Sequence, residues 1–375
     1  MNRRLPFAAG ILLALGCVCT AFTRASETTT AASAASVAPT LQTSATTAGP
    51  AQASPIQAPS KAPLLCIPFR VREQDEIWVV STRGLGCVGC GSPAVNYHVL
   101  KYSKQRWVNS TPSALYATDD PAVLTVFFLH GNRIDYQESL RDGLETYFQL
   151  VGRLSDERPV RFVVWSWPSD QIHGVLKDVR SKAARTDEEG YYFAKFMAGM
   201  SSDGEVGLVS YSLGGRIITG GLHLLGGGSL CGRYVPAGDR PTMRVAMWAA
   251  ALHNDWLIPG RYHGNALPLA DRWYIAINGC DPVLARYRAL QKRTNPVALG
   301  YAGMWGTNLL SPSLRTRIEQ EYVSNIVGKS HEREPYLYSP YIAARTRDTV
   351  LWQDRIESAK SQISNIKQIQ MAKSE

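Results

Sequence analysis

The sequence has 375 residues, of which 45% are hydrophobic and 19% charged, so it can build one large core and is neither fibrous nor wholly disordered. Its 40 Lys and Arg against 31 Asp and Glu give a net charge of +9. The basic residues are scattered rather than clustered, which disfavours a nucleic-acid-binding protein but leaves an anionic substrate or membrane surface open. Beyond the N-terminus no long uninterrupted apolar stretch occurs, so we do not expect the body of the chain to span a bilayer.

Residues 1–26 are predicted to be a secretory signal peptide. Arg3 and Arg4 precede an apolar run over residues 7–16 that is too short for a spanning helix. We therefore expect an exported protein that is periplasmic, in the cell envelope or secreted. Leu15-Gly16-Cys17 loosely resembles a bacterial lipobox, although Ala14 stands where Leu or Val is usual. A lipid anchor on Cys17, with membrane association through it, and simple secretion both remain open.

Residues 27–63 consist mainly of Ala, Thr, Ser, Pro and Gln, a composition that cannot bury enough surface to fold, so a disordered tether is expected there. The catalytic domain is expected over residues 64–348. The tail, 349–375, is rich in Gln, Ser and Lys and is interpreted as a surface helix or a frayed end.

Five cysteines lie beyond the signal peptide and tether: Cys66, Cys87, Cys90, Cys231 and Cys280. Export permits disulfides, and the odd number leaves at least one thiol free or paired elsewhere. The Cys87-Val-Gly-Cys90 segment lies among glycines that indicate a turn, and no second ligand pair at metal spacing follows it. A structural disulfide or plain thiols are favoured there over a metal or redox site.

After the tether, strands and helical patterns alternate along the chain. Two early antiparallel strands are expected over 77–81 and 97–108, followed by buried strands over 122–129, 160–167, 205–211, 244–252 and 272–278, and a final strand around 322–327. Helices are expected over 136–154 and 175–200. Continuous apolar strands with intervening helices predict a doubly wound α/β sheet, whose active site forms outside the carboxyl ends of the strands.

Ser212 stands where the 205–211 strand gives way to a helix, which is the setting of a nucleophile elbow. The G-x-S-x-G pattern needs small residues two positions before and after the serine, because strand and helix approach closely there. Ser210 and Gly214 meet this demand, with Ser210 replacing the first glycine. The backbone N–H of Leu213 would then stabilise a developing oxyanion. The alternative is a plain small-residue turn.

The second oxyanion donor is expected in the loop His130-Gly-Asn-Arg133, which follows the 122–129 strand. Gly131 allows the backbone to approach the site, and either Asn132 or Arg133 would offer its N–H. His130 is interpreted as structural.

A serine nucleophile needs a base and an acid that orients the base, and these are expected in the chain order Ser, acid, His. Asp281 follows the 272–278 strand and is preferred over Asp255, which follows the strand before it. His331 follows the final predicted strand and is the candidate base. The remaining histidines either precede Asp281 (His253, His263) or are interpreted as surface or core residues (His98, His173, His223).

Together these segments resemble the α/β-hydrolases, within them a bacterial esterase/lipase-like branch of unknown function, over about residues 124–342. The resemblance rests on five motifs: His130-Gly-Asn132, Trp167-Pro-Ser169, Ser210-Tyr-Ser-Leu-Gly-Gly215, Asn278 to Asp281 with Pro282-Val-Leu284, and Gly328-Lys-Ser-His331. It implies a mostly parallel sheet of about eight strands with helices on both faces and a Ser212, Asp281, His331 triad. Ser210 and the cysteine-containing segment before Leu124 depart from the family pattern.

The leading hypothesis is an exported serine hydrolase acting on a carboxylic ester, a thioester or a lipid ester, without a metal or organic cofactor. The alternatives are a catalytically idle binding or scaffold protein at the cell surface and an acyltransferase with the same triad. An aromatic group is interpreted as core rather than pocket lining: Trp165, Trp167, Tyr191, Tyr192, Phe193 and Phe196.

Overall fold

The computed structural model describes residues 70–86, 95–290 and 295–353, which form an α/β fold. The predicted signal peptide, the tether, Cys17, Cys66, Cys87, Cys90 and the tail from residue 354 onward lie outside the described residues. No helix within those ranges combines the length and the apolar character that crossing a lipid bilayer requires.

The centre of the fold is a mixed sheet with the strand order β3-β2-β1-β5-β4-β6-β7-β8-β9. Its strands are β1 Glu76–Ser81, β2 His98–Ser103, β3 Arg106–Ser110, β4 Leu124–Leu129, β5 Val160–Ser166, β6 Glu205–Tyr211, β7 Thr242–Trp248, β8 Ala270–Ile277 and β9 Ile318–Tyr322. In the part of the sheet that runs β1-β5-β4-β6-β7-β8-β9, every pair of neighbouring strands is parallel. At the β1 edge, β2 pairs antiparallel with both β1 and β3. The described sheet thus has nine strands, where the resemblance implies about eight.

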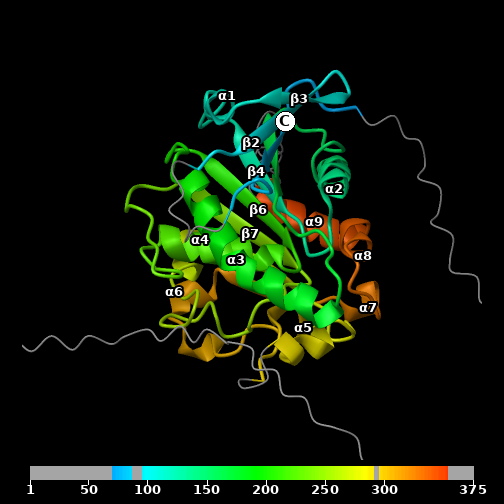
Figure 1. The fold of residues 1–375 in the computed structure, drawn as a ribbon, viewed down its shortest axis with the longest axis vertical. Helices are drawn as coiled ribbons and strands as arrows, with labels where there is room; N and C mark the ends of the chain where they lie inside the picture. Colours follow the sequence, from blue (N-terminus) through cyan, green and yellow to red (C-terminus); the bar gives the residue numbers. More distant parts are fainter. Residues whose placement is uncertain (1–69, 87–94, 291–294, 354–375) are drawn as a thin grey trace, which may run out of the picture. The chain divides into compact units, whose positions relative to one another are not determined.

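Helices cover both faces of this sheet. The α-helices are α1 Pro112–Tyr116, α2 Tyr136–Leu150, α3 Val175–Met197, α4 Gly214–Leu225, α5 Leu299–Ala302, α6 Pro312–Arg315, α7 Ser324–Val327, α8 Glu334–Leu337 and α9 Pro340–Val350. Short 3₁₀ segments are Leu267–Leu269, Leu284–Leu290 and Thr307–Leu309. Figure 1 shows α3 and α4 in front of the sheet and the orange α9 behind it. The sheet therefore lies between two helical layers.

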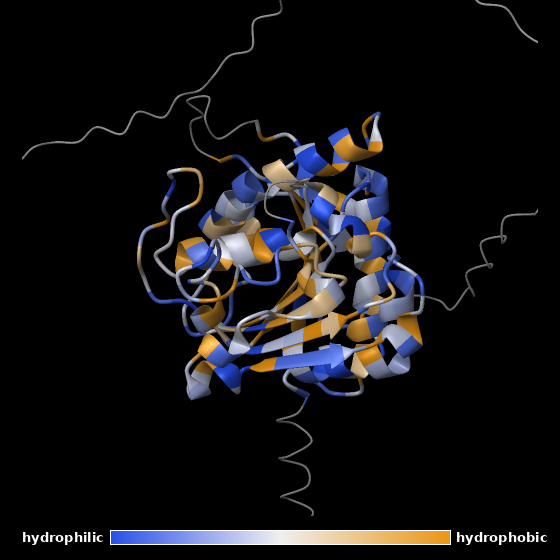
Figure 2. Cartoon of the chain, turned by 90° about the horizontal axis from the view of Figure 1, so that it is seen from below, coloured by the Kyte–Doolittle hydropathy of each residue, from blue (hydrophilic) through white to orange (hydrophobic). Residues whose placement is uncertain are grey.

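The alternation of side chains along β5 shows how the layers are built. Val164 points toward α2, where it fills the space left by Gly143, while the next residue, Trp165, packs edge-on against Phe193 of α3. Val164 and Trp165 are both fully buried. Figure 2 shows the hydrophobic residues concentrated in the inner strands, with mixed colours on the surrounding helices. The core is therefore the sheet interior and the two helix layers pressed onto it.

Three predicted strands differ from the structure by more than two residues. The 97–108 segment is a hairpin rather than one strand, because Lys104 and Gln105 adopt φ of 49° and 61° and reverse the chain. The 244–252 strand ends at Trp248, since Ala249 has a φ of 47°. The last strand, β9, covers Ile318–Tyr322 instead of 322–327, and residues 324–327 form the short helix α7.

Candidate functional site

Ser212 lies at the junction of β6 and α4, with a φ of 53°. This left-handed conformation is uncommon for a residue with a side chain and marks a strained turn. The turn is tight because α4 starts directly against the end of β4: a Cβ on Gly214 would lie 2.3 Å from the backbone oxygen of Leu129. Glycine at position 214 is therefore required by the close approach.

A chain of hydrogen bonds connects Ser212 to Asp281 through His331. Ser212 Oγ lies 3.0 Å from His331 Nε2, and His331 Nδ1 lies 2.6 Å from Asp281 Oδ2. With the ring proton on Nδ1 donated to the carboxylate, Nε2 is free to accept the serine hydroxyl proton. The structure thus brings together the three residues that the sequence indicates as nucleophile, base and acid.

Backbone N–H groups hold Asp281, the residue at the acid end of these hydrogen bonds. Asp281 is fully buried, and its second oxygen, Oδ1, accepts the N–H groups of Val283 and Leu284 at 2.8 and 2.9 Å. One carboxylate oxygen is therefore occupied by the turn after β8, which leaves Oδ2 aimed at His331.

The loop that carries His331 is held by two side chains whose contacts the sequence does not indicate. Asn278, at the end of β8, donates from Nδ2 to the backbone oxygens of Gly328 and Ser330 at 2.9 and 3.0 Å. The hydroxyl of Tyr211, next to the candidate nucleophile, donates to the backbone oxygen of His331 at 2.5 Å. These bonds fix the imidazole relative to Ser212. The position of Tyr211 beside Ser212 is the only sequence signal that could have singled it out.

The loop after β4, which carries Gly131 and Asn132, approaches the turn at Ser212. A Cβ on Gly131 would lie 2.8 Å from two ring carbons of Tyr211 and 3.2 Å from Ser212 Cβ, so any larger residue would have to displace the Tyr211 ring. The N–H of Arg133 donates to Ser169 O at 2.8 Å, whereas those of Asn132 and Leu213 have no acceptor among the described residues. Of the two alternatives for the second donor, the free N–H is therefore that of Asn132.

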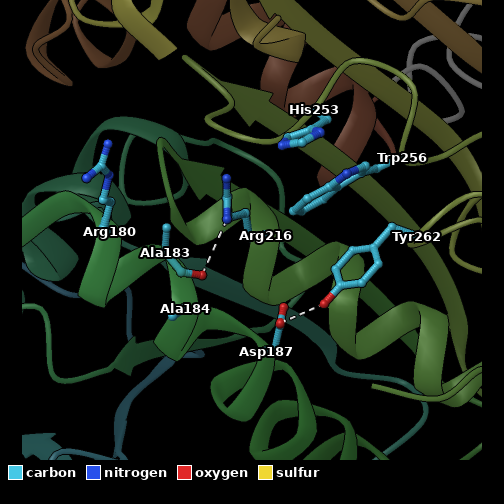
Figure 3. A pocket seen from close by; sticks show the side chains of 8 residues that line it. All are labelled: Arg180, Ala183, Ala184, Asp187, Arg216, His253, Trp256 and Tyr262. Carbon is cyan, nitrogen blue, oxygen red and sulfur yellow. Dashed lines mark hydrogen bonds between the residues drawn. The ribbon is translucent and has the colours of Figure 1, made fainter. Parts of the chain in front are cut away.

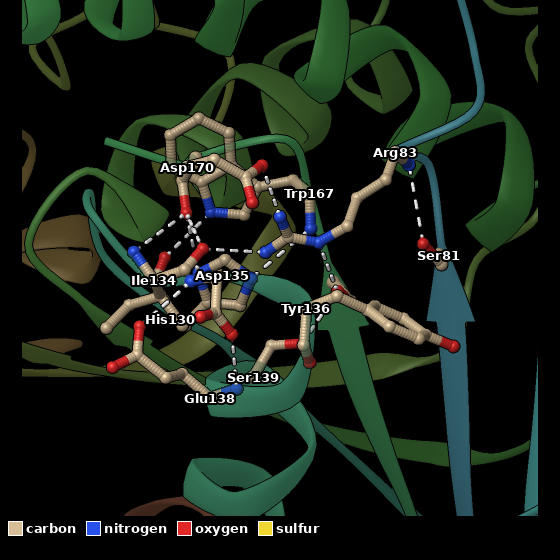
Figure 4. A network of polar contacts seen from close by, with 12 residues as sticks. Ser81, Arg83, His130, Ile134, Asp135, Tyr136, Glu138, Ser139, Trp167 and Asp170 are labelled. Atoms are coloured by element: carbon tan, nitrogen blue, oxygen red, sulfur yellow. Dashed lines mark hydrogen bonds and ion pairs between the residues drawn. The ribbon is translucent and has the colours of Figure 1, made fainter. Parts of the chain in front are cut away.

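Arg83 and His130 anchor this loop, as Figure 4 shows. The Arg83 guanidinium donates to Ser166 Oγ, Ile134 O and Asp170 Oδ2 at 2.9, 2.8 and 2.6 Å. His130 is buried, and its Nδ1 donates to Gly131 O at 2.9 Å. Burial, together with the charge of Arg83, lowers the pKa of His130 to about 3, so its imidazole is neutral.

Asp178, near the start of α3, holds the loop from the other side. Its Oδ2 accepts Asn132 Nδ2 at 3.0 Å and Arg133 Nε at 2.8 Å, and its Oδ1 accepts the N–H of Ile172 at 3.1 Å. Burial by itself would raise the pKa of Asp178, but these donors outweigh it and lower the pKa. The amide nitrogen of the Asn132 side chain is therefore bound to Asp178, while the backbone N–H of Asn132 has no acceptor among the described residues.

The rival site residues lie elsewhere. Oδ2 of Asp255 lies 3.8 Å from Nε of Arg261. His253 stacks on Trp256, and the buried His263 is hydrogen-bonded to Thr219. None of these three has a hydrogen bond to Ser212 among the described residues. His98 and His173 are exposed, and His223 is buried and accepts the Asn265 N–H.

The predicted aromatic group is mostly core: five of its members are buried and only Tyr191 is half-exposed. Cys231 and Cys280 both lie on the surface. Within the described ranges, no group of three or more His, Cys, Asp or Glu side chains is arranged as metal ligands.

No protein-family model matches the chain, and no curated protein matches it. An acetyl xylan esterase, solved as an iodinated complex, aligns at 13% identity and a TM-score of 0.32, covering 62% of this chain and 99% of that one. The catalytic core domain of the Trichoderma reesei acetyl xylan esterase aligns at 11% identity and a TM-score of 0.27, covering 54% and 82%. Similarity at these TM-scores carries no weight for fold or function.

Proposed function

We propose that this protein is a serine hydrolase of the α/β-hydrolase fold that cleaves a carboxylic ester through an acyl-enzyme. The observation that carries the proposal is the hydrogen-bond chain from Ser212 through both nitrogens of His331 to Asp281, with distances of 3.0 and 2.6 Å. The fold assignment is supported by position: the three residues follow β6, β8 and β9, at the carboxyl ends of parallel strands.

In this mechanism His331 Nε2 removes the hydroxyl proton of Ser212 while Oγ attacks the ester carbonyl carbon. The charge that develops on the carbonyl oxygen is stabilised by the N–H groups of Leu213 and Asn132. The protonated His331 then gives its proton to the departing alcohol, which leaves an acyl group on Ser212. Water attacks the acyl group by the same route and frees the serine. Asp281 orients the imidazole and stabilises its charged form.

The experiment is to label the purified protein with a fluorophosphonate probe, which reacts only with an activated serine. Wild type should label and Ser212→Ala should not. Ser210→Ala is the matched control, because it removes a buried hydroxyl two residues away and should leave labelling intact. A folded wild type that does not label would refute the proposal and favour an idle binding protein. Release of acyl groups to added alcohols in preference to water would instead indicate an acyltransferase.

We further propose that the protein is exported after removal of residues 1–26. The basic start and the short apolar run of the sequence support this. The mass of the mature protein from a secreting host tests the cleavage site. A mature chain that instead begins at Cys17, with a mass increase that disappears in Cys17→Ala, would identify the lipid-anchored form. An uncleaved N-terminus would refute export.

A further inference from the structure

A pocket of about 520 Å³ opens between α3, the start of α4 and the loop after β7 (Figure 3). Its polar and aromatic lining comprises Arg180, Asp187, Arg216, His253, Trp256 and Tyr262. The volume is in the range of small-molecule sites.

Hydrogen bonds of Arg216 connect the pocket to the segments that carry the candidate catalytic residues. Arg216 lies four residues after Ser212, and its Nε donates to Ala251 O at 2.7 Å, while the Ala251 N–H donates to Ser212 O at 3.1 Å. Arg216 Nη2 also donates to the hydroxyl of Tyr287, which belongs to the 3₁₀ segment that follows Asp281. One arginine thus contacts the segments that carry both the nucleophile and the acid.

Arg216 is a buried cation that forms no ion pair in the described structure, although the Asp187 carboxyl in the same pocket interacts with it electrostatically. Its residue is 7% exposed, and it forms no ion pair with a carboxylate in the described part of the chain. Its guanidinium carbon lies 4.8 and 5.6 Å from the ring centroids of Trp256 and Tyr287, contacts that partly offset the cost of burial. A buried charge normally forms an ion pair, and Asp187 is hydrogen-bonded to Tyr262 rather than to Arg216, so the missing ion pair needs an explanation.

Arg216 also has side-chain N–H groups that form no hydrogen bond among the described residues. Nη1 donates to Ala183 O and Nη2 to Tyr287, which leaves one N–H on each terminal nitrogen without an acceptor among the described residues. Figure 3 places the guanidinium between α3 on one side and His253 and Trp256 on the other. Two free N–H groups on a planar guanidinium suit the two oxygens of a carboxylate.

The other charged groups favour a single negative charge on the ligand. Asp187 is engaged by the hydroxyl of Tyr262 at 2.7 Å, and burial raises the pKa of Asp187. Burial and the nearby charge of Arg216 lower the pKa of His253 to about 4, so this ring is neutral. With Arg180 at the exposed side, the pocket has two positive charges against one negative charge, a surplus that a monoanion would neutralise.

We propose that the pocket binds a second, uncleaved carboxylate of the ester substrate, with Arg216 as its counter-ion. This rests on the proposed function of Ser212 and adds a substrate class to it: small esters with a free carboxylate. The aromatic side chains of Trp256 and Tyr262 supply apolar contact to the body of the ligand beside that group.

The test compares matched esters. One pair is 4-acetoxybenzoate and 4-acetoxybenzamide, the other is the mono-4-nitrophenyl ester of adipate and its neutral methyl ester. We expect kcat/KM for the carboxylate member of at least one pair to exceed that of its neutral partner by about tenfold or more. Arg216→Met should abolish this preference, chiefly through KM. Arg106→Met, which removes an exposed charge on the edge strand β3, should preserve it.

Equal rates for both pairs in the wild type, or a preference that survives in folded Arg216→Met, would overturn the proposal. Faster hydrolysis of 4-acetoxyphenyl phosphate than of the carboxylate would replace the carboxylate by a phosphate. If Arg216→Met does not fold, inhibition of neutral-ester hydrolysis in the wild type decides: adipate should compete and adipamide should not.

Failure of the proposed hydrolase is recognised separately by absent fluorophosphonate labelling. Calorimetric titration of wild type and Ser212→Ala with adipate then decides the pocket assignment. Binding supports it, and no binding to either protein refutes it.

Discussion

Replacing Gly214 by alanine provides a sharp test of the tight turn at Ser212. The added Cβ would lie 2.3 Å from Leu129 O and 2.9 Å from His130 O. Ordinary contact needs about 3.5 Å, so the end of β4 and the start of α4 must separate by about 1 Å. Both colliding atoms are backbone, and no rotamer change can relieve the contact.

The adjacent Gly215 supplies a matched control. A Cβ there would meet Leu252 Cδ2 at 3.3 Å, the far end of a flexible side chain. Overpacking against fixed backbone costs about 3 kcal/mol, and replacing glycine by alanine in a helix returns about 1 kcal/mol. We therefore expect Gly214→Ala to lower the free energy of unfolding by about 2 kcal/mol, and Gly215→Ala to change it little or raise it by up to about 1 kcal/mol.

Urea denaturation of the two variants and the wild type measures the difference. Ester hydrolysis and fluorophosphonate labelling should also fall in Gly214→Ala, because the displaced turn moves Ser212 relative to His331. If the two variants unfold within about 0.5 kcal/mol of each other, the steric account of this turn is wrong.

Three further predictions concern neighbouring groups. The hydroxyl of Ser210 is buried without a hydrogen-bond partner in the described structure. Ser210→Ala should therefore raise the free energy of unfolding, measured by urea denaturation, by about 1 kcal/mol. A decrease would mean that the hydroxyl does form a stabilising hydrogen bond. The pKa of His130 is lowered from 6.5 to about 3, so below pH 6.5 the unfolded chain binds a proton that the folded chain does not, and stability falls as the pH falls toward 3. In His130→Gln the free energy of unfolding should therefore fall less steeply between pH 6.5 and 3, by up to about 1.4 kcal/mol per pH unit, in urea denaturation at a series of pH values. An equal pH dependence in both proteins would mean that His130 is protonated in the folded state. Asp281→Asn should lower kcat about 10³-fold or more with little change in KM, since the amide would donate to His331 Nδ1 and force the wrong tautomer; near-normal kcat would exclude Asp281 as the orienting acid.

The buried parallel strands could be predicted because their apolar runs are continuous. The prediction for 205–211 coincides with β6, and those for the strands on either side of it in sequence differ only at their ends. The turn at Lys104 and Gln105 was not predictable, because neither residue is one of the types that usually adopt positive φ. The polar edge strand β9, Ile-Glu-Gln-Glu-Tyr, also lacks the apolar pattern on which strand prediction depends.

The candidate site likewise contains residues that the sequence predicts and residues that it does not. Local patterns place Ser212, Asp281 and His331 at the ends of elements, and the structure brings their side chains within hydrogen-bond distance. The contacts of Tyr211, Asn278 and Arg216 cross more than thirty residues of sequence and depend on how loops pack, which no local pattern encodes. The surroundings of a site are therefore harder to predict than its reacting groups.

The bonds from Tyr211 and Asn278 to the loop of His331 limit how this site can change over time. A longer or shorter 328–331 loop would break three hydrogen bonds to backbone oxygens and misplace the imidazole at once. The loop after β7 contacts Ser212 through Ala251, before the residues that line the pocket. Its pocket-lining part, with His253, Trp256 and Tyr262, forms no hydrogen bond to the 328–331 loop in the described structure. Altered substrate preference, whether by natural divergence or by laboratory selection, should therefore arise from insertions and substitutions after β7, with the histidine loop keeping its length.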